Sequence, residues 1–170
     1  MSAFTIPGLL LAVLVSLHVA TIAIAALTCR TSARRRSANV EPMPPATIVR
    51  PVSGLDFMLD ETLATTFGLD HPDYQILFCA ASESDAAVPI VRALIARHPH
   101  ANARLLIGND PISENPKLNN VAKGWREARN DFIVMIDSNV LLPADYLQRC
   151  FAAWDERAGL VSAPPAGSHV

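Results

Sequence analysis

The strongest constraint on the fold is a regular alternation of two kinds of segment after residue 46. Four short runs are nearly all apolar and rich in β-branched or aromatic residues, as strands covered on both faces are: 47–52, 74–81, 103–108 and 131–136. Between them, three segments place apolar residues three to four positions apart, which is typical of surface helices: 58–67, 86–98 and 117–129. This repeated order predicts a doubly wound α/β domain with a mostly parallel sheet.

The amino terminus carries a second apolar pattern that is too long for a strand of such a domain. No charged residue occurs from Ala3 to Leu27, and this length is sufficient to cross the hydrocarbon core of a membrane. Arginines follow the run at 30 and 34–36, whereas a cleaved signal peptide carries its basic residues before a shorter apolar run. We therefore expect an uncleaved transmembrane helix within residues 1–29, with the rest of the chain cytoplasmic because basic residues stay on that side.

The rest of the composition separates a linker from one domain. Residues 30–46 are rich in Arg, Ser, Asn and Pro, which predicts a solvated linker before a domain over 47–170. A formal net charge of −2 gives no basic surface for nucleic acid, so no nucleic-acid partner is expected. Cys29, Cys79 and Cys150 lack metal-site spacing and are interpreted as buried thiols in a reducing compartment.

Polar clusters occur where the predicted strands end. They cover residues 50–54, 82–85, 109–120 and 137–139. Ligands of open α/β sheets bind at the carboxyl ends of the strands, so these clusters are expected on one rim. Carboxylate and amide oxygens there suit a hydrated Mg²⁺ or Mn²⁺ that bridges phosphate oxygens. The pattern predicts a nucleotide diphosphate as the ligand.

Five short motifs appear in an order that carries a family resemblance. They are RPVSG, LDHPDYQILFCAASESD, NPKLNN, DFIVMIDSNV and GLVSAPP. Over roughly residues 48–165 the chain resembles the start of a family 2-type glycosyltransferase, and within that group it is most similar to ceramide glucosyltransferases. The resemblance implies a GT-A-type, Rossmann-like sheet, here incomplete and preceded by one transmembrane helix.

The resemblance also implies roles for particular residues. An aspartate after the second strand, Asp85, contacts the nucleotide, and Asp137 holds the metal and the diphosphate as the first residue of a degenerate D-x-D motif. Asn139 stands where many relatives have the second aspartate, and this amide would bind a metal less strongly. The candidate nucleotide-sugar-binding residues are Arg50, Pro51, Asp85, Asn115, Lys117 and Asp137, and the candidate metal ligands are Asp137 and Asn139.

The implied activity is the inverting transfer of a hexose, with glucose from UDP-glucose expected, to a lipid hydroxyl such as that of ceramide. A divalent metal, Mg²⁺ or Mn²⁺, would offset charge on the leaving diphosphate. The resemblance places the catalytic base beyond Val170, so the chain is expected to be an amino-terminal part that is inactive by itself. Hopanoids, diacylglycerol and polysaccharide chains remain open as acceptors.

Several alternatives compete with this interpretation. The D-x-N triplet could be an ordinary strand-to-helix turn with Ser138 or Asp145 as a helix cap, and Arg50 could form a salt bridge at the strand end. A nucleotidyltransferase on a similar sheet, or a non-catalytic module that binds nucleotides or tethers to membranes, are the other two function classes. Trp125 and Trp154 have apolar neighbours at helical spacing, which predicts core packing for both.

Overall fold

The structure is a computed structural model of the chain, and it describes residues 6–34, 43–154, 157, 159–163, 165 and 167. The chain divides into two compact units, Met1–Ala38 and Asn39–Val170, which are treated separately below. Of the predicted linker, residues 35–42 lie outside the described part of the chain.

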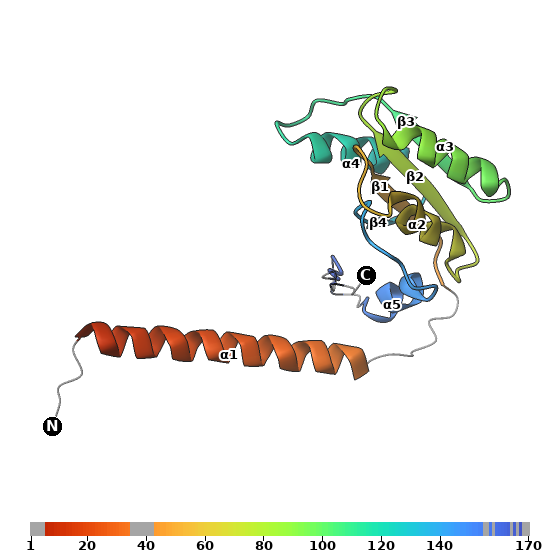
Figure 1. The fold of residues 1–170 in the computed structure, drawn as a ribbon. Coiled ribbons are helices and arrows are strands. Elements are labelled where there is room, and N and C mark those ends of the chain that lie inside the picture. Colours follow the sequence, from red (N-terminus) through yellow and green to blue (C-terminus); the bar gives the residue numbers. More distant parts are fainter. Residues whose placement is uncertain are drawn as a thin grey trace. The chain divides into compact units, whose positions relative to one another are not determined.

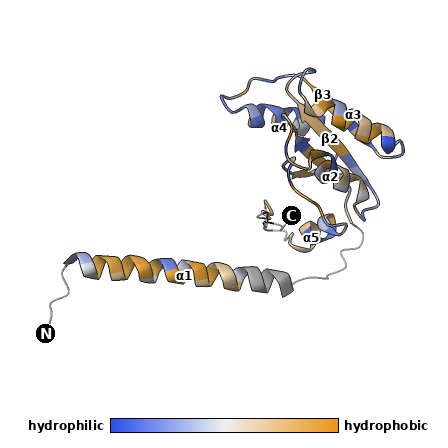
Figure 2. Ribbon diagram, in the orientation of Figure 1, coloured by the Kyte–Doolittle hydropathy of each residue, from blue (hydrophilic) through white to orange (hydrophobic). Residues whose placement is uncertain are grey.

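The first unit contains one helix, α1 (Ile6–Arg34), which extends past the predicted end of the anchor at residue 29. The stretch Pro7–Thr28 has a mean hydropathy of 2.5 over its best window and is mostly hydrophobic in Figure 2. None of the residues in that window is buried. The hydroxyls of Ser16 and Thr21 donate to carbonyls one turn back, so their polar groups are satisfied within the helix. By length and composition, α1 could therefore cross a membrane.

The second unit contains a sheet of four parallel strands in the order β3-β2-β1-β4 (Figure 1). The strands are β1 (Ala46–Pro51), β2 (Tyr74–Ala80), β3 (Ala103–Ile107) and β4 (Phe132–Met135). β1 pairs with β2 on one side and with β4 on the other, and β2 pairs with β3. All three pairings are parallel. The prediction of a parallel sheet from four apolar runs is confirmed.

Helices cover both faces of this sheet. They are α2 (Leu59–Ala64), continued by the 3₁₀ turn η1 (Thr65–Gly68), then α3 (Ala87–Arg97), α4 (Pro116–Glu127) and α5 (Tyr146–Ala152). One face carries Ile76 and Phe78, which pack with α2 and α3, and Ile48, which packs with α5. Because strand side chains alternate between faces, Val49 and Cys79 point to the other face, where α4 lies.

Helix α4 packs tightly against the sheet at Gly124. A Cβ atom placed on Gly124 would lie 2.4 Å from Cγ1 of Val49 and 2.9 Å from Sγ of Cys79. Only a residue without a side chain lets α4 pack this close to β1 and β2. The position of α4 matters because its first turn contributes to the site described below.

Three packing details correct the sequence-based expectations. Trp125 and Trp154 are 56% and 40% exposed, so neither is the core residue that was predicted. Cys79 is buried as expected, whereas Cys150 is only half-buried and Cys29 lies in a segment whose side chains are not described. Burial raises the pKa of the Cys79 thiol to about 11, which keeps this thiol protonated at neutral pH.

Candidate functional site

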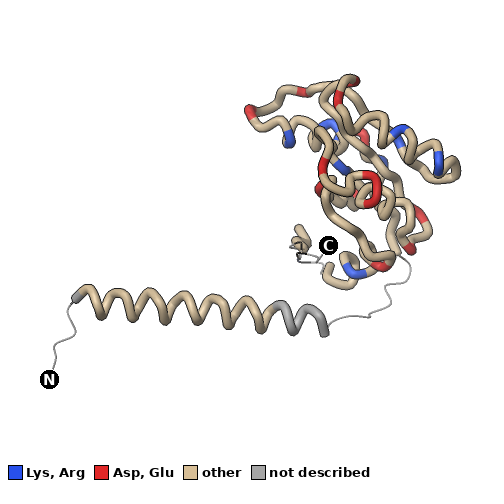
Figure 3. Tube along the Cα trace, in the orientation of Figure 1, with Lys and Arg blue, Asp and Glu red and all other residues tan. Residues whose placement is uncertain are grey.

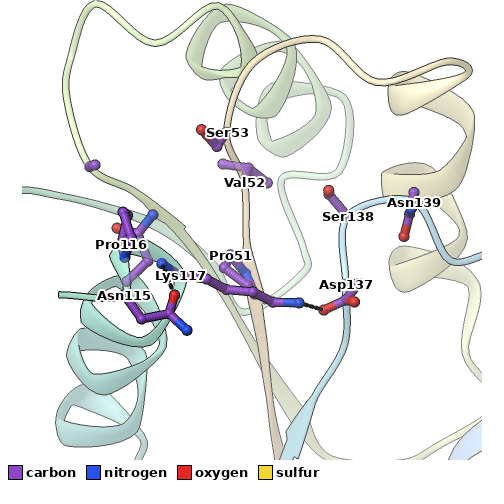
Figure 4. Close-up of a pocket in the computed structure, with 11 residues that line it drawn as sticks. Pro51, Val52, Ser53, Asn115, Pro116, Lys117, Asp137, Ser138 and Asn139 are labelled. Carbon is purple, nitrogen blue, oxygen red and sulfur yellow. Dashed lines mark hydrogen bonds and ion pairs between the residues drawn. The ribbon is translucent and has the colours of Figure 1, made fainter. Parts of the chain in front are cut away.

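A pocket lies where the carboxyl ends of β1 and β4 meet the first turn of α4 (Figure 4). In the strand order β3-β2-β1-β4, the chain leaves β1 toward β2 on one side and later returns as β4 on the other side. This reversal is the topological switch point at which open α/β sheets bind their ligands. The pocket has a volume of about 450 Å³ and is lined by Pro51, Val52, Ser53, Ala81, Asn115, Pro116, Lys117, Asn120, Asp137, Ser138 and Asn139.

The first turn of α4 positions a lysine at this pocket. Asn115 is the N-cap, and its side-chain oxygen accepts hydrogen bonds from the backbone N–H groups of Lys117 (3.0 Å) and Leu118 (3.4 Å). Pro116 occupies the first helical turn, where its missing N–H costs nothing. The Nζ atom of Lys117 lies 2.5 Å from Oδ1 of Asp137, and both side chains are more than half exposed. Figure 4 marks this ion pair with a dashed line.

The Asp137 side of the pocket is a tight turn directly after β4. The N–H of Val140 donates to the carbonyl of Asp137 at 3.3 Å, and Oγ of Ser138 donates to the carboxylate of Asp56 at 2.9 Å. Asp145 occupies the N-cap position of α5 but makes no capping hydrogen bond, and its carboxylate pairs with Arg149. Neither Ser138 nor Asp145 therefore caps α5 with its side chain, so the capping part of the structural alternative is wrong, whereas the turn itself is present.

Arg50 does not line the pocket, and its predicted contact with the donor stays a prediction. Its side chain is fully buried on the face of the sheet opposite α4, and it forms no salt bridge with a carboxylate in the described part of the chain. Its guanidinium instead donates to backbone carbonyls of the turn that carries Asp137. The reason is its place in β1, since Arg50 alternates with Val49 and Pro51 and points to the other face.

Asp85 does not line the pocket either. Its Oδ1 atom accepts hydrogen bonds from the backbone N–H groups of Gly54 and Ala87, each at 2.9 Å. Gly54 has a φ of 68° in the loop after β1, so Asp85 joins this loop to the start of α3. Its predicted contact with a nucleotide stays a prediction.

Lys123, a buried lysine next to the pocket, was not identified as a candidate from the sequence. Lys123 donates to the carbonyls of Ala80 (2.8 Å) and Gly108 at the ends of β2 and β3, and to Oδ1 of Asn120 (3.4 Å). Burial lowers the pKa of Lys123, while Cys79 and Asp110 oppose this shift. The ammonium group of Lys123 thus binds the side chain of Asn120, which lines the pocket. The NPKLNN motif includes Asn120, but the sequence does not tell which of its side chains face inward.

The pocket offers few protein ligands to a divalent metal. No group of three or more His, Cys, Asp or Glu side chains in the described ranges could hold an ion. A single carboxylate, that of Asp137, with the amide of Asn139 two residues on, suits a cation that takes its other ligands from water and phosphate oxygens. Mg²⁺ usually binds proteins in this manner. The metal roles of Asp137 and Asn139 remain predictions.

The fold and the position of the pocket define a GT-A-like domain. The mannosyltransferase PcManGT from Pyrobaculum calidifontis, solved in complex with GDP-Man and Mn²⁺, has a similar structure with a TM-score of 0.54. The two chains are 18% identical, and the similarity covers 83% of this chain and 43% of PcManGT. At this identity the likeness concerns the fold, and it confirms the GT-A-type sheet expected from the sequence.

The sequence then identifies the family. Residues 13–170 match glycosyl transferase family 21, and the chain belongs to that family. A ceramide glucosyltransferase of Komagataella phaffii is 37% identical over 116 residues, and ceramide glucosyltransferase 1 of Caenorhabditis elegans is 34% identical over 110 residues. These alignments cover 64% and 63% of this chain but 23% and 24% of the two relatives, so the chain spans about a quarter of their length.

Proposed function

We propose that this chain forms the donor-binding part of a membrane-anchored glycosyltransferase. The enzyme would transfer a hexose, with UDP-glucose as the donor. The observation that carries the proposal is the pocket at the β1–β4 switch point, where Lys117 and Asp137 face each other. A family of glycosyltransferases and relatives named ceramide glucosyltransferases support it. A non-catalytic module explains the fold equally well but gives no reason for an exposed lysine opposite an exposed carboxylate at a ligand-binding edge.

The two charged side chains suit the two ends of a metal–diphosphate complex. Lys117 lies at the amino end of α4, where a cation opposes the helix dipole, and an anionic phosphate beside it would remove this conflict. Asp137 and Asn139 would hold the divalent metal, which, when bound, offsets the negative charge that develops on the leaving diphosphate. Asn115 and Pro51 line the same space and would contact the donor.

The acceptor in this proposal is a lipid hydroxyl, with ceramide as the first candidate and inversion at the sugar carbon. Helix α1 would anchor the enzyme to the membrane in which such a lipid resides, with the sheet unit on the cytoplasmic side. An anchored enzyme and a lipid acceptor share one surface, which raises their effective concentration. Hopanoids, diacylglycerol and polysaccharide chains are the alternative acceptors.

The test of the proposal is a titration of the detergent-solubilised chain with UDP-glucose by calorimetry. Binding should require Mn²⁺ or Mg²⁺, should be lost in excess EDTA, and should be competed by UDP. GDP-mannose and UTP serve as comparison ligands. Equal affinity for UDP-glucose, GDP-mannose and UTP would contradict a uridine diphosphate sugar as the donor. Tighter binding of UTP than of UDP-glucose would favour a nucleotidyltransferase. No binding of any of them would refute the proposal.

Replacing Lys117 by Gln should weaken UDP binding without a comparable loss of stability. Gln keeps a polar side chain, one atom shorter than that of lysine, but removes the positive charge, and a charge-assisted hydrogen bond contributes about tenfold in affinity. The ion pair with Asp137 is exposed, so its loss should change the free energy of unfolding by less than about 1 kcal/mol. Isothermal titration and urea denaturation measure the two effects.

The control for this change is Arg126→Gln on the same helix. Arg126 also forms an exposed ion pair, with Asp110 at 2.6 Å, but does not line the pocket. Its removal should leave UDP affinity unchanged. If both variants lose affinity to the same extent, general surface charge rather than a contact of Lys117 attracts the nucleotide.

Deleting residues 1–29 should release the chain from membranes. The apolar side chains of α1 are exposed from Pro7 to Thr28, and Figure 3 shows no charged residue on the coloured part of this helix. Transfer of such a surface into lipid is favourable in proportion to its area. After expression, the full chain should resist extraction with alkaline carbonate, and the shortened chain should appear in the supernatant. A shortened chain that only detergent extracts would contradict the single anchor.

A further inference from the structure

Arg50 connects the buried face of the sheet to the turn that carries Asp137. Its side chain is fully buried. Nη1 donates to the carbonyl of Thr62 (3.0 Å) and to Oγ1 of Thr66 (2.6 Å), both in the α2–η1 segment. Nη2 donates to three carbonyls of the turn, those of Asp137 (2.8 Å), Ser138 (3.1 Å) and Val140 (2.9 Å). One guanidinium thus holds three of four consecutive residues of the turn.

Core stability alone does not explain a cation at this position. Burial lowers the pKa of Arg50 to about 10, against the opposing effect of Asp137, so the group is still charged at neutral pH but poorly solvated. Its Nε–H has no hydrogen-bond partner in the described part of the chain. Replacing a buried charge by a well-packed apolar side chain is often neutral or stabilising. The directed hydrogen bonds to the turn are what an apolar residue could not supply.

The hydrogen bonds of Arg50 also determine where the amide groups of the turn point. In a trans peptide unit the carbonyl and the N–H point in opposite directions. The carbonyls of Asp137 and Ser138 point to Arg50, so the N–H groups of Ser138 and Asn139 point away from it. These two residues line the pocket, whereas Arg50 does not. Successive N–H groups on the same side of a turn form a concave binding site for an anion.

We propose that Arg50 is a positioning residue for the diphosphate: it fixes the turn so that the Asp137 carboxylate and the N–H groups of Ser138 and Asn139 face the pocket. The inference rests on the proposed function, since it assigns the second half of the same diphosphate site. Phosphate oxygens would accept hydrogen bonds from the two N–H groups opposite Lys117. Thr62 supports the arrangement, because its hydroxyl donates to the carbonyl of Ser138 at 2.7 Å.

The test compares Arg50→Met and Arg50→Lys with a matched control, Thr66→Val. Methionine fills part of the same volume without a donor, and lysine restores a positive charge that can reach only some of the acceptors. Thr66→Val removes the shortest hydrogen bond of Arg50 on its α2–η1 side but leaves the three bonds to the turn. The Kd for UDP with Mn²⁺, the melting temperature, and the hydrogen exchange of the Val140 amide are measured on the full chain in detergent.

Arg50→Met should weaken UDP binding by about 10–100-fold, the usual effect of losing a residue that orients a ligand-binding group. Arg50→Lys should bind UDP with intermediate affinity. Thr66→Val should lower the melting temperature but keep the wild-type Kd for UDP. If Arg50→Met does not fold, the comparison of Arg50→Lys with Thr66→Val decides. Wild-type affinity in a folded Arg50 variant, or an equal loss of affinity in Thr66→Val, would overturn the inference.

A further measurement separates this inference from the proposed function. The N–H of Val140 donates to the carbonyl of Asp137, one of the acceptors that Arg50 holds. Its hydrogen exchange, measured without nucleotide or metal, should be faster in Arg50→Lys than in Thr66→Val. If the wild-type chain does not bind UDP, the proposed function fails, and with it the diphosphate role of Arg50. The exchange rates then still report whether Arg50 holds the turn, and equal rates in both variants would refute that too.

Discussion

Asp137→Asn is expected to lose most of the metal-dependent affinity for UDP while the fold is retained. The amide has nearly the same shape as the carboxylate but lacks the negative charge that a hard divalent cation requires. We expect a loss of at least about tenfold, because even changes in residues that only orient metal ligands have effects of that size. The turn should persist, since Arg50 binds the backbone carbonyl of Asp137 and not its side chain. Titration with UDP at fixed Mn²⁺ measures the loss.

Two comparisons make this expectation specific to the charge of Asp137. Asn139→Asp adds a carboxylate two residues further on and should keep or tighten metal binding. If Asp137 instead served only the turn, Asp137→Asn would leave UDP affinity unchanged and reduce the free energy of unfolding by about 1 kcal/mol, as loss of a capping group does. The broken ion pair with Lys117 has little effect in either case, because both side chains are exposed. Unchanged affinity would remove Asp137 from the proposed metal site.

Gly124→Ala is expected to destabilise the sheet unit strongly. The added Cβ would lie 2.4 Å from Cγ1 of Val49, well inside van der Waals contact, so α4 or β1 has to move. Overpacking of this kind costs about 1–3 kcal/mol, which outweighs the gain of about 1 kcal/mol in helix propensity when Gly is replaced by Ala. The midpoint of urea denaturation should fall. UDP affinity should fall too, because α4 carries Asn115 and Lys117.

Gly68→Ala is the matched control for this substitution. A Cβ atom on Gly68 meets no heavy atom within 4 Å, so the change in stability should stay within about 0.5 kcal/mol. Val49→Ala in the Gly124→Ala background should recover part of the lost stability, since it removes both methyl groups that clash. A Gly124→Ala chain as stable as the wild type would show that α4 packs less closely on β1 than the structure indicates.

Much of the fold follows from local patterns that the packing does not override. The strand runs are apolar on both faces because helices cover both faces, and the predicted strand bounds agree with the observed ones to within one or two residues. Pro116 and Asn115 begin α4 by capping chemistry that is visible in the sequence. Helix α5 was expected only within an alternative, the strand-to-helix turn, because its seven residues are too few to show a helical period.

The site was predictable in outline and not in detail. The rule that ligands bind at the carboxyl ends of parallel strands correctly brings Lys117 and Asp137 together, since it depends only on strand direction. It does not distinguish Arg50, which belongs to the same rim in sequence but points to the opposite face. Trp125 shows the same limitation, because helical spacing places it on a face of α4 without telling which face the sheet covers.

The sequence by itself determined which segments become strands and helices, that the strands run parallel, and which edge of the sheet carries the polar residues. These properties follow from the spacing of apolar residues along each segment and from the order of the segments along the chain, both of which are read directly from the sequence. Only the tertiary structure decided which polar side chains enter the pocket and which support it from behind. Arg50, Asp85 and Lys123 each bind backbone groups of segments distant in the sequence, and the most distant partners are separated from them by 90, 31 and 43 positions. Such contacts exist only after the sheet has assembled, because no local pattern encodes which carbonyl or N–H lies within reach.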